Sequence, residues 1–332
     1  MNAQSTSAAH LSLTALGAFA GIYIIWGTTY LAIAIAIQTL PPFISGAARF
    51  LLAGAAMYTW LRWRNPRPFA GVDLRIAALC GVLLSGVGNG FVIWAQQGIP
   101  SGIAALVVTS VPVIVLVLDW AFFSKRAPTR QALLGTAIAL AGVVTIVAHT
   151  RSLSGAAQPL YLAAMAAATF GWACGTLLQK RAARPETVLS FTCAQMLFGG
   201  LFQVAMSFVD REWSTFDLSA VSGASVLAVL YLIVFGSIVA LNCYLWLLTR
   251  VAAQKVTTYA LVNPVVALIL GAVVLNERIT LLAITAAALV LIGVTLVLFQ
   301  EVSPVKLWRA RRARIREAKV SAECAAPGAR SP

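Results

Sequence analysis

Apolar stretches about as long as a membrane is thick follow one another along most of this chain, and they limit the folds open to it. A bilayer has a hydrocarbon core about 30 Å thick, which an α-helix of about 20 residues crosses. Only 10% of the 332 residues are charged, whereas a soluble domain carries about 25%. We therefore expect an all-α integral membrane protein. Its ten expected transmembrane helices are residues 13–36, 43–61, 75–97, 101–123, 130–148, 159–180, 187–209, 223–248, 255–275 and 280–299.

The chain also repeats itself. Two offsets, 146 and 152 residues, relate matching residues in its two halves. Because each half holds five spans, an odd number, the second half must enter the membrane from the opposite side. We therefore expect two inverted five-helix repeats, residues 13–148 and 159–299, an arrangement typical of secondary transporters. The matching pairs are Trp26 with Trp172, Arg49 with Gln195, Trp94 with Trp246, and Pro112 with Pro264.

Basic residues alternate between the two sides of the expected topology. With the N-terminus in the cytoplasm, 20 of the 24 Lys and Arg residues fall in inner loops or in the C-terminal tail, as the positive-inside rule requires. The outer loops hold only Arg151, Arg211 and Arg278, and Arg49 lies within a span. The sequence therefore predicts a multi-pass protein of the cell inner membrane with both termini in the cytoplasm, of which residues 1–12 form a short N-terminal segment.

The net charge of +14 is concentrated in the inner loops and in the tail. Residues 300–332 are expected to form a basic, partly disordered cytoplasmic tail. In it, the run from Lys306 to Arg316 is either a nucleic-acid patch or a juxtamembrane helix on anionic lipid. Its position directly after the last span favours lipid. The expected partners are therefore membrane lipid and a small-molecule substrate, without nucleic acid or nucleotide, and a monomer is sufficient.

Catalytic motifs are missing from the sequence. Its two His residues, His10 and His149, lie at membrane edges, and it contains no HExxH motif, no Walker-type phosphate loop and no pair of intramembrane carboxylates. Hydrolytic and metal-dependent enzymes need such groups, so we expect no enzyme, no cofactor and no metal site. A channel would need a continuous file of polar groups, and a sensor would need a signalling domain. The apolar spans and short loops favour a carrier over both.

Two aromatic side chains lie too deep for the headgroup region. Trp26 and Trp172 are each about halfway along their spans, where they either line a cavity or pack in the core. The polar residues that follow them, such as Tyr30, favour a cavity. Pro112 and Pro264 are also at mid-span, where a Pro removes one backbone hydrogen bond. Each is either a hinge or a simple packing kink.

Other candidates offer polar or aromatic groups within spans. Arg49 lies about two turns into the second span, where its guanidinium either extends to the outer surface or faces a cavity and holds a carboxylate. Trp94 and Trp246 lie within a turn of a helix end and suit an anchor or a gate equally. The candidate substrate-binding residues are Trp26, Tyr30, Arg49, Asn89, Trp94, Trp172, Asn242, Trp246 and Asn263.

Short motifs at matching depths point to one family. They are Trp26-Gly27, Ala48-Arg49-Phe50, Val111-Pro112, Asn263-Pro264, Leu275-Asn276-Glu277-Arg278, and the late glycines Gly142 and Gly293. Over residues 13–299 the chain resembles the EamA-type permeases of the drug/metabolite transporter superfamily. The second half departs from the pattern at Gln195, where the first half has Arg49, and at Ala173, which replaces a Gly.

The resemblance implies a carrier that exports small metabolites, which we expect to work by alternating access. Amino acids are favoured, aromatic or large neutral ones first, because aromatic faces stack on rings and Arg49 suits a carboxylate. Cationic drugs or toxins, and metabolites such as nucleoside or sugar derivatives, are the alternatives. No carboxylate is expected near the midplane, where proton relays normally need one. Downhill facilitation therefore fits the sequence at least as well as proton exchange.

Overall fold

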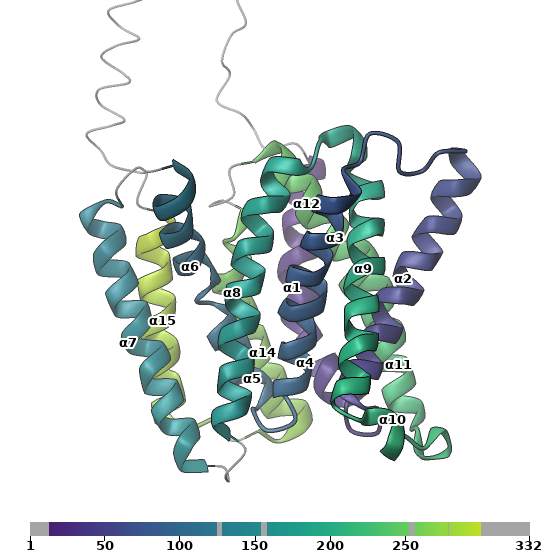
Figure 1. Cartoon of the computed structure of the whole chain (residues 1–332). Helices are drawn as coiled ribbons and strands as arrows, with labels where there is room; N and C mark the ends of the chain where they lie inside the picture. Colours follow the sequence, from purple (N-terminus) through teal and green to yellow (C-terminus); the bar gives the residue numbers. More distant parts are fainter. Residues whose placement is uncertain (1–12, 125–127, 154–157, 252–255, 278, 300–332) are drawn as a thin grey trace, which may run out of the picture.

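The computed structural model describes residues 13–299 except 125–127, 154–157, 252–255 and 278. Every element in this part of the chain is helical, and no strand occurs in it (Figure 1). The α-helices are α1 (Leu13–Ala36), α2 (Pro42–Arg64), α3 (Leu74–Cys80), α4 (Gly90–Ala95), α5 (Ser101–Val108), α6 (Val111–Leu118), α7 (Arg130–Leu153), α8 (Gln158–Ala182), α9 (Val188–Val209), α10 (Glu212–Thr215), α11 (Gly223–Tyr231), α12 (Ala240–Arg250), α14 (Tyr259–Leu275) and α15 (Leu281–Leu298). The other helical segments are the π-helices η1 (Gly81–Asn89), η2 (Asp119–Ser124) and η5 (Leu232–Val239) and the 3-10 turns η3 (Pro185–Thr187) and η4 (Leu218–Ala220).

Seven helical segments are long and apolar enough to cross a membrane, which shows the multi-pass, all-helical membrane class. Three predicted spans are not among them. The second predicted span coincides with α2, which carries Arg49 within it and two further Arg in its last turn, while the apolar parts of α7 and α14 are shorter. The count of ten crossings stays a prediction. The seven segments are Leu13–Ala36, Leu74–Ala95, Ser101–Phe122, Pro159–Ala182, Pro185–Val209, Gly223–Arg250 and Leu281–Leu298.

Three of these segments are not single α-helices, although the sequence predicts continuous spans. In Leu74–Ala95 and Gly223–Arg250 the middle part is a π-helix, η1 and η5 respectively, whose turns are wider than those of an α-helix. Ser101–Phe122 is interrupted between α5 and α6, just before Pro112. At the start of η1, a Cβ on Gly81 would overlap a carbonyl oxygen of α9. The irregular segments therefore lie where helices approach each other closely.

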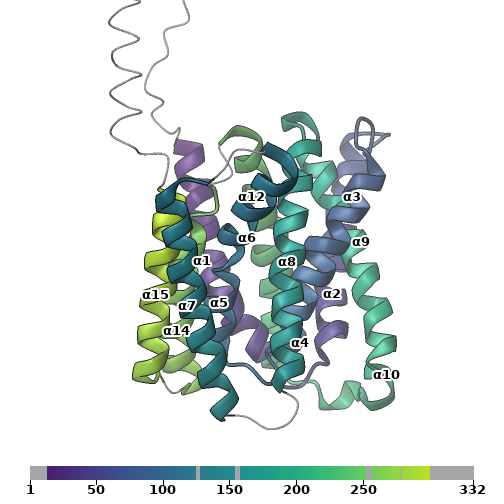
Figure 2. The same cartoon turned by 60° about the vertical axis from the view of Figure 1, so that its left-hand side comes forward.

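Matching helices of the two halves pack against each other. α2 lies beside α9, and α7 lies beside α15, in both views (Figure 1 and Figure 2). Likewise α1 contacts α12 and α14, while α8 contacts η1, α4 and α6. A Cβ on Gly54 would lie 2.8 Å from Leu197, and one on Gly200 would lie 2.8 Å from Leu51. The two Gly residues are 146 positions apart, and so are the two Leu residues. Each half therefore contributes a Gly to one contact and a Leu to the other, which is the pattern that an internal two-fold axis produces.

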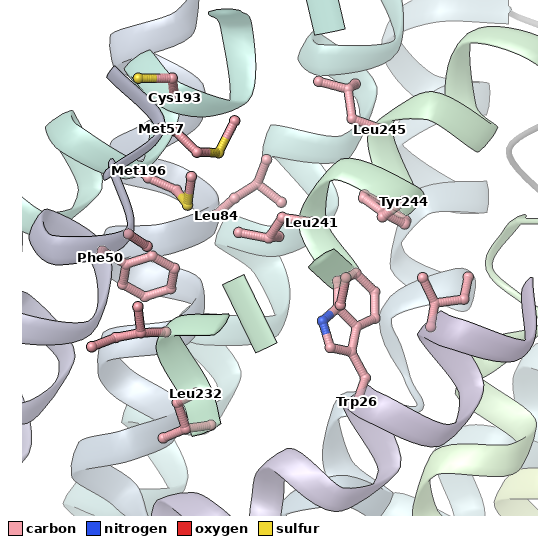
Figure 3. Close-up of a cluster of buried hydrophobic side chains, with 14 of the residues drawn as sticks. Trp26, Phe50, Met57, Leu84, Cys193, Met196, Leu232, Leu241, Tyr244 and Leu245 are labelled. Atoms are coloured by element: carbon pink, nitrogen blue, oxygen red, sulfur yellow. The ribbon is translucent and has the colours of Figure 1, made fainter. Parts of the chain in front are cut away.

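The buried core follows this contact between the halves. Figure 3 shows part of it, in which Trp26 of α1 lies near Tyr244 of α12, and Phe50 of α2 lies near Met196 of α9. The described chain also begins and ends at the same end of the bundle, since α1 starts where α15 finishes (Figure 2). An even number of passes between these two points follows.

We expect Gly293→Ala to destabilise the fold, because a Cβ there would overlap the Ala139 backbone nitrogen and the Gly135 carbonyl oxygen. Backbone atoms cannot rotate away, so α15 must move from α7, at a cost of about 1–3 kcal/mol. The measurement is the thermal unfolding midpoint of the detergent-solubilised protein. Gly17→Ala is the matched control, since Gly17 has open space around it. Equal losses in both variants would contradict the prediction.

Candidate substrate cavity

A cavity lies between the two halves, lined by residues of α1, α2, η1, α4, α5, α6, α8 and α14. Its volume is about 50 Å³, which corresponds to about four water molecules. A cavity this narrow must widen to admit an amino acid. Six predicted site residues line it: Trp26, Tyr30, Arg49, Asn89, Trp172 and Asn263.

Four aromatic rings form a cluster at one wall of the cavity. The ring centroid of Trp26 lies 5.6 Å from that of Trp172, 5.1 Å from that of Tyr244 and 4.8 Å from that of Tyr259. Most pairs meet edge to face or tilted, as aromatic quadrupoles prefer. The two Trp residues, which the sequence pairs at the 146-residue offset, are therefore in direct contact at the centre of the bundle.

The two indole N–H groups have different surroundings. The Trp26 Nε1 donates a hydrogen bond of 3.4 Å to the Gly236 carbonyl in η5. The Trp172 Nε1 is buried and has no hydrogen-bond geometry with any described residue, although the hydroxyls of Tyr244 and Tyr259 lie within electrostatic reach. The two indoles therefore differ, since only the Trp26 N–H meets the geometry of a hydrogen bond.

Arg49 lies in the wall of the cavity and does not extend to the surface, since only 2% of it is exposed. Its Nε donates to the Ser237 hydroxyl at 2.8 Å, and its guanidinium carbon lies 4.7 Å from the Phe50 ring centroid. Its Nη1 is buried without a hydrogen-bond partner among the described residues. A buried cation with an unused donor is costly, and a bound carboxylate would offset that cost.

The three Asn candidates serve different bonds. With its amide oriented to donate, the Asn263 nitrogen lies 3.2 Å from the carbonyl oxygens of Tyr23 and Tyr259, and so links α14 to α1. Asn89 donates to the Leu84 carbonyl at 3.1 Å, within η1. Both line the cavity. Asn242 does not line it.

Trp94 lies away from the cavity, at the end of α4. Its Nε1 donates to the Asp210 carboxylate at 2.9 Å, and its ring centroid lies 4.8 Å from that of Tyr161. Phe43 and Phe91 meet nearby, with ring centroids 6.2 Å apart. These contacts join α2, α4, α8 and α9 at the end of the bundle opposite to the one where α1 begins (Figure 1). The structure therefore places Trp94 apart from the six candidates that line the cavity.

Trp246 and Asn242 also lie outside the cavity, in a separate surface hollow between α1, α9 and α12. The Arg250 guanidinium carbon lies 4.3 Å from the Trp246 ring centroid, a cation–π contact. The Asn242 amide donates to the Ile238 carbonyl at 2.6 Å. Trp246 was predicted because it matches Trp94 at the 152-residue offset, and Asn242 because it places an amide within a span. On α12 it is Tyr244 that packs on Trp26.

The two predicted hinge residues differ in their surroundings. Pro112 follows the break between α5 and α6, and the flanking Val108 and Val111 line the cavity. Pro264 lies inside α14, which continues through it. The span of Pro112 is therefore interrupted by a turn directly before the Pro, whereas in the matching span the turn, at Thr257 and Thr258, precedes α14 and lies farther from Pro264.

Sequence reasoning missed two residues at the site, Tyr244 and Tyr259. Both rings pack on Trp26, and Tyr259 also lines the cavity. A signal was available, because a Tyr deep in an apolar span carries a hydroxyl that must be hydrogen-bonded. Tyr244 meets this need with the Thr176 hydroxyl, 3.0 Å away.

Two carboxylates cap helices at the Trp94 end of the bundle. Glu212 accepts bonds of 2.8 Å from the backbone nitrogens of Phe43 and Ile44 at the start of α2. Glu277 accepts from the Ser101 nitrogen and hydroxyl, both at 2.8 Å, at the start of α5. Helix N-termini favour negative charge. Burial raises the pKa of Glu212, and the two backbone bonds oppose this rise.

The cavity offers groups that can bind a small molecule. It offers aromatic faces, a guanidinium, amides and hydroxyls. Within the described part of the chain, no three His, Cys, Asp or Glu residues lie close enough to hold a metal ion. A long helical bundle with a central polar and aromatic cavity defines the class of multi-pass membrane proteins that bind small molecules between two halves.

The sequence pattern of the EamA-like transporter family matches residues 13–148 and again residues 159–299. The chain therefore belongs to this family, within the drug/metabolite transporter superfamily, and is a membrane transporter.

Relatives and a solved structure agree with this assignment. The chain is 36% identical over 286 residues to the uncharacterized inner membrane transporter YedA of Escherichia coli (strain K12), covering 86% of this chain and 90% of that one. It is 26% identical over 295 residues to a probable amino-acid metabolite efflux pump of Salmonella typhimurium (strain LT2), covering 84% and 92%. A crystal structure 20% identical in sequence covers 88% of this chain and 98% of the other with a TM-score of 0.59, which shows a similar fold.

We expect Glu277→Ala to destabilise the protein by about 1–2 kcal/mol, because α5 loses the acceptor at its N-terminus. Thermal unfolding in detergent measures the loss. Glu186→Ala is the control, since Glu186 is an exposed carboxylate before α9. An equal loss of stability in Glu186→Ala and in Glu277→Ala would contradict the capping role of Glu277.

Proposed function

We propose that this protein is an inner-membrane secondary transporter that exports small metabolites by alternating access around the central cavity. The name of the 36%-identical relative supports an inner-membrane location. The observation that carries the proposal is the cavity itself: it lies between the two halves, and a buried guanidinium and four aromatic rings surround it. Carriers bind their cargo at such a contact between repeats.

The proposed architecture has ten spans in two inverted repeats, residues 13–148 and 159–299. The reciprocal packing of α2 on α9 and of α7 on α15 supports the two-fold relation, and the odd number of predicted spans in each half supports the inversion. Residues 1–12 and 300–332, which lie outside the described residues, are proposed to be cytoplasmic segments on the basis of the Lys and Arg distribution.

Amino acids are the favoured cargo, aromatic or large neutral ones first. An aromatic ring would stack on the Trp26 and Trp172 cluster, and a carboxylate would bind the unused donor of Arg49. A relative described as a probable amino-acid metabolite efflux pump supports this class. A cationic drug would use the aromatic rings but would meet the Arg49 charge, so it is the second candidate.

Topology is tested with reporter fusions. The distribution of Lys and Arg puts both termini inside, so a cytoplasm-active reporter fused at Pro332 should be active. The same reporter fused after Ser154 should be inactive, because that loop is predicted to lie outside. Enzyme activity per unit of fusion protein, quantified by immunoblot, is the measurement. The reverse pattern would exclude the inverted arrangement.

Transport is tested by counterflow in proteoliposomes. Liposomes that contain a carrier take up labelled substrate faster when they are preloaded with unlabelled substrate, whereas liposomes that contain a channel do not. We expect this stimulation from at least one amino acid in a panel that also contains cationic toxins. We further expect net flux to persist without a pH gradient, since no carboxylate lines the cavity among the described residues. Flux that disappears whenever the proton gradient is collapsed would contradict this second expectation.

The aromatic cluster is tested by single substitutions. Trp26→Ala and Trp172→Ala should each lower the flux of a ring-bearing substrate roughly three- to tenfold through lost stacking. Trp60→Ala is the control, because Trp60 lies near the C-terminal end of α2, outside the cavity lining, and is 41% exposed. Flux is measured in cells at matched expression. Equal losses at all three positions would point to folding damage and not to a cavity role.

A further inference from the structure

Arg49 and Gln195, which match at the 146-residue offset, each donate a hydrogen bond to a Ser hydroxyl of the opposite half. Arg49 of the first half donates through Nε to the Ser237 hydroxyl of the second, at 2.8 Å. Gln195 of the second half donates through Nε2 to the Ser85 hydroxyl of the first, at 3.5 Å. Arg49 and Gln195 are 146 residues apart, and Ser85 and Ser237 are 152 apart. The cavity wall at Arg49 therefore has a counterpart at Gln195, built from matching residues.

The two places differ in what stands beside the donor. Next to Gln195 lies Gln179 of α8, which donates through Nε2 to the Gln195 Oε1 at 2.8 Å. Both are almost fully buried. The residue that matches Gln179 at the 146-residue offset is Ile33 of α1, which lines the cavity together with Arg49. In the second half, the Gln179 carboxamide thus occupies the position beside Gln195. In the first half, the matching position belongs to the apolar side chain of Ile33, which borders the cavity.

The chemistry of Arg49 restricts what can enter that space. A guanidinium has only donors, so the missing neighbour must be an acceptor. Nη1 has no partner among the described residues, and a carboxylate matches the guanidinium both in charge and in its pair of acceptor oxygens. Gln195 is neutral, so a neutral amide is enough to satisfy it. The charged donor and the vacant position therefore occur in the same half.

We propose that a carboxylate of the transported molecule occupies, beside Arg49, the place that the Gln179 carboxamide fills beside Gln195, and that Ile33 determines specificity by keeping this place free. The proposal rests on the proposed function for the identity of the ligand as cargo. The geometry of the site does not depend on it, so the two are tested separately.

The geometry is tested in the purified protein without ligand. In Ile33→Glu the side chain has the length of Gln179 and carries its carboxylate to Arg49, so it should occupy the site permanently. We expect the Ile33→Glu protein to melt several degrees above the Ile33→Glu, Arg49→Gln double variant, and Arg49→Gln alone to cause no comparable loss. Ile33→Leu reports the effect of changing the apolar side chain without adding an acceptor. An Ile33→Glu protein that is no more stable than the double variant overturns the proposal.

The ligand is tested with two probes of equal shape, phenylacetate and its neutral amide, phenylacetamide. Phenylacetate should raise the melting temperature of the wild-type protein more than phenylacetamide does. Arg49→Gln should weaken the binding of phenylacetate at least about tenfold, the loss of one charged hydrogen bond, and Ile33→Glu should abolish it. Stabilisation by the amide that equals or exceeds that by the acid overturns the proposal. If phenylacetate binds as predicted while no substrate shows counterflow, the carboxylate site stands and the transport function fails.

Discussion

In the hydrocarbon core of a membrane no water is available to backbone amides and carbonyls, so any departure from a regular helix must be sheltered by protein. In this chain the π-helices η1 and η5 and the break between α5 and α6 lie where the two halves meet. Their backbone groups bond to side chains of the opposite half: the Gly236 carbonyl of η5 accepts from Trp26, and the Ser85 carbonyl of η1 accepts from Gln203. Irregular backbone at membrane depth is tolerated only where protein shelters it. The polar backbone groups of these segments are therefore found at the contact between the halves.

Close packing of the helices follows from the same environment. Lipid chains are as apolar as Leu side chains, so helices associate through tight van der Waals contact and small residues. The Gly54 and Leu197 contact, and its reciprocal at Gly200 and Leu51, place one small and one large residue on each side of the junction between α2 and α9. The cavity beside this junction is narrow, so the proposed cargo would need it to widen.

The sequence predicts well what depends on periodicity and offset, and less well what depends on the direction of a side chain. The helical membrane class follows from span length. The 146-residue offset pairs Trp26 with Trp172, and the structure adds that their rings are in contact. Trp94 and Trp246 were predicted as candidate substrate-binding residues that suit an anchor or a gate equally, and both lie outside the cavity lining. Residues two apart in an α-helix point to nearly opposite sides, so Tyr244 of α12 packs on Trp26 while Trp246 lies in the outer hollow. Hydropathy does not tell which of two neighbouring aromatic residues faces inward.

The conformational asymmetry between the halves bears on how such a carrier would operate. The span of Pro112 has a turn directly before the Pro, whereas α14 continues through Pro264. In the proposed alternating access, two inverted copies would exchange such differences between them. Arg49 has no charged counterpart in the second half, so a carboxylate would be held by the same half in both states.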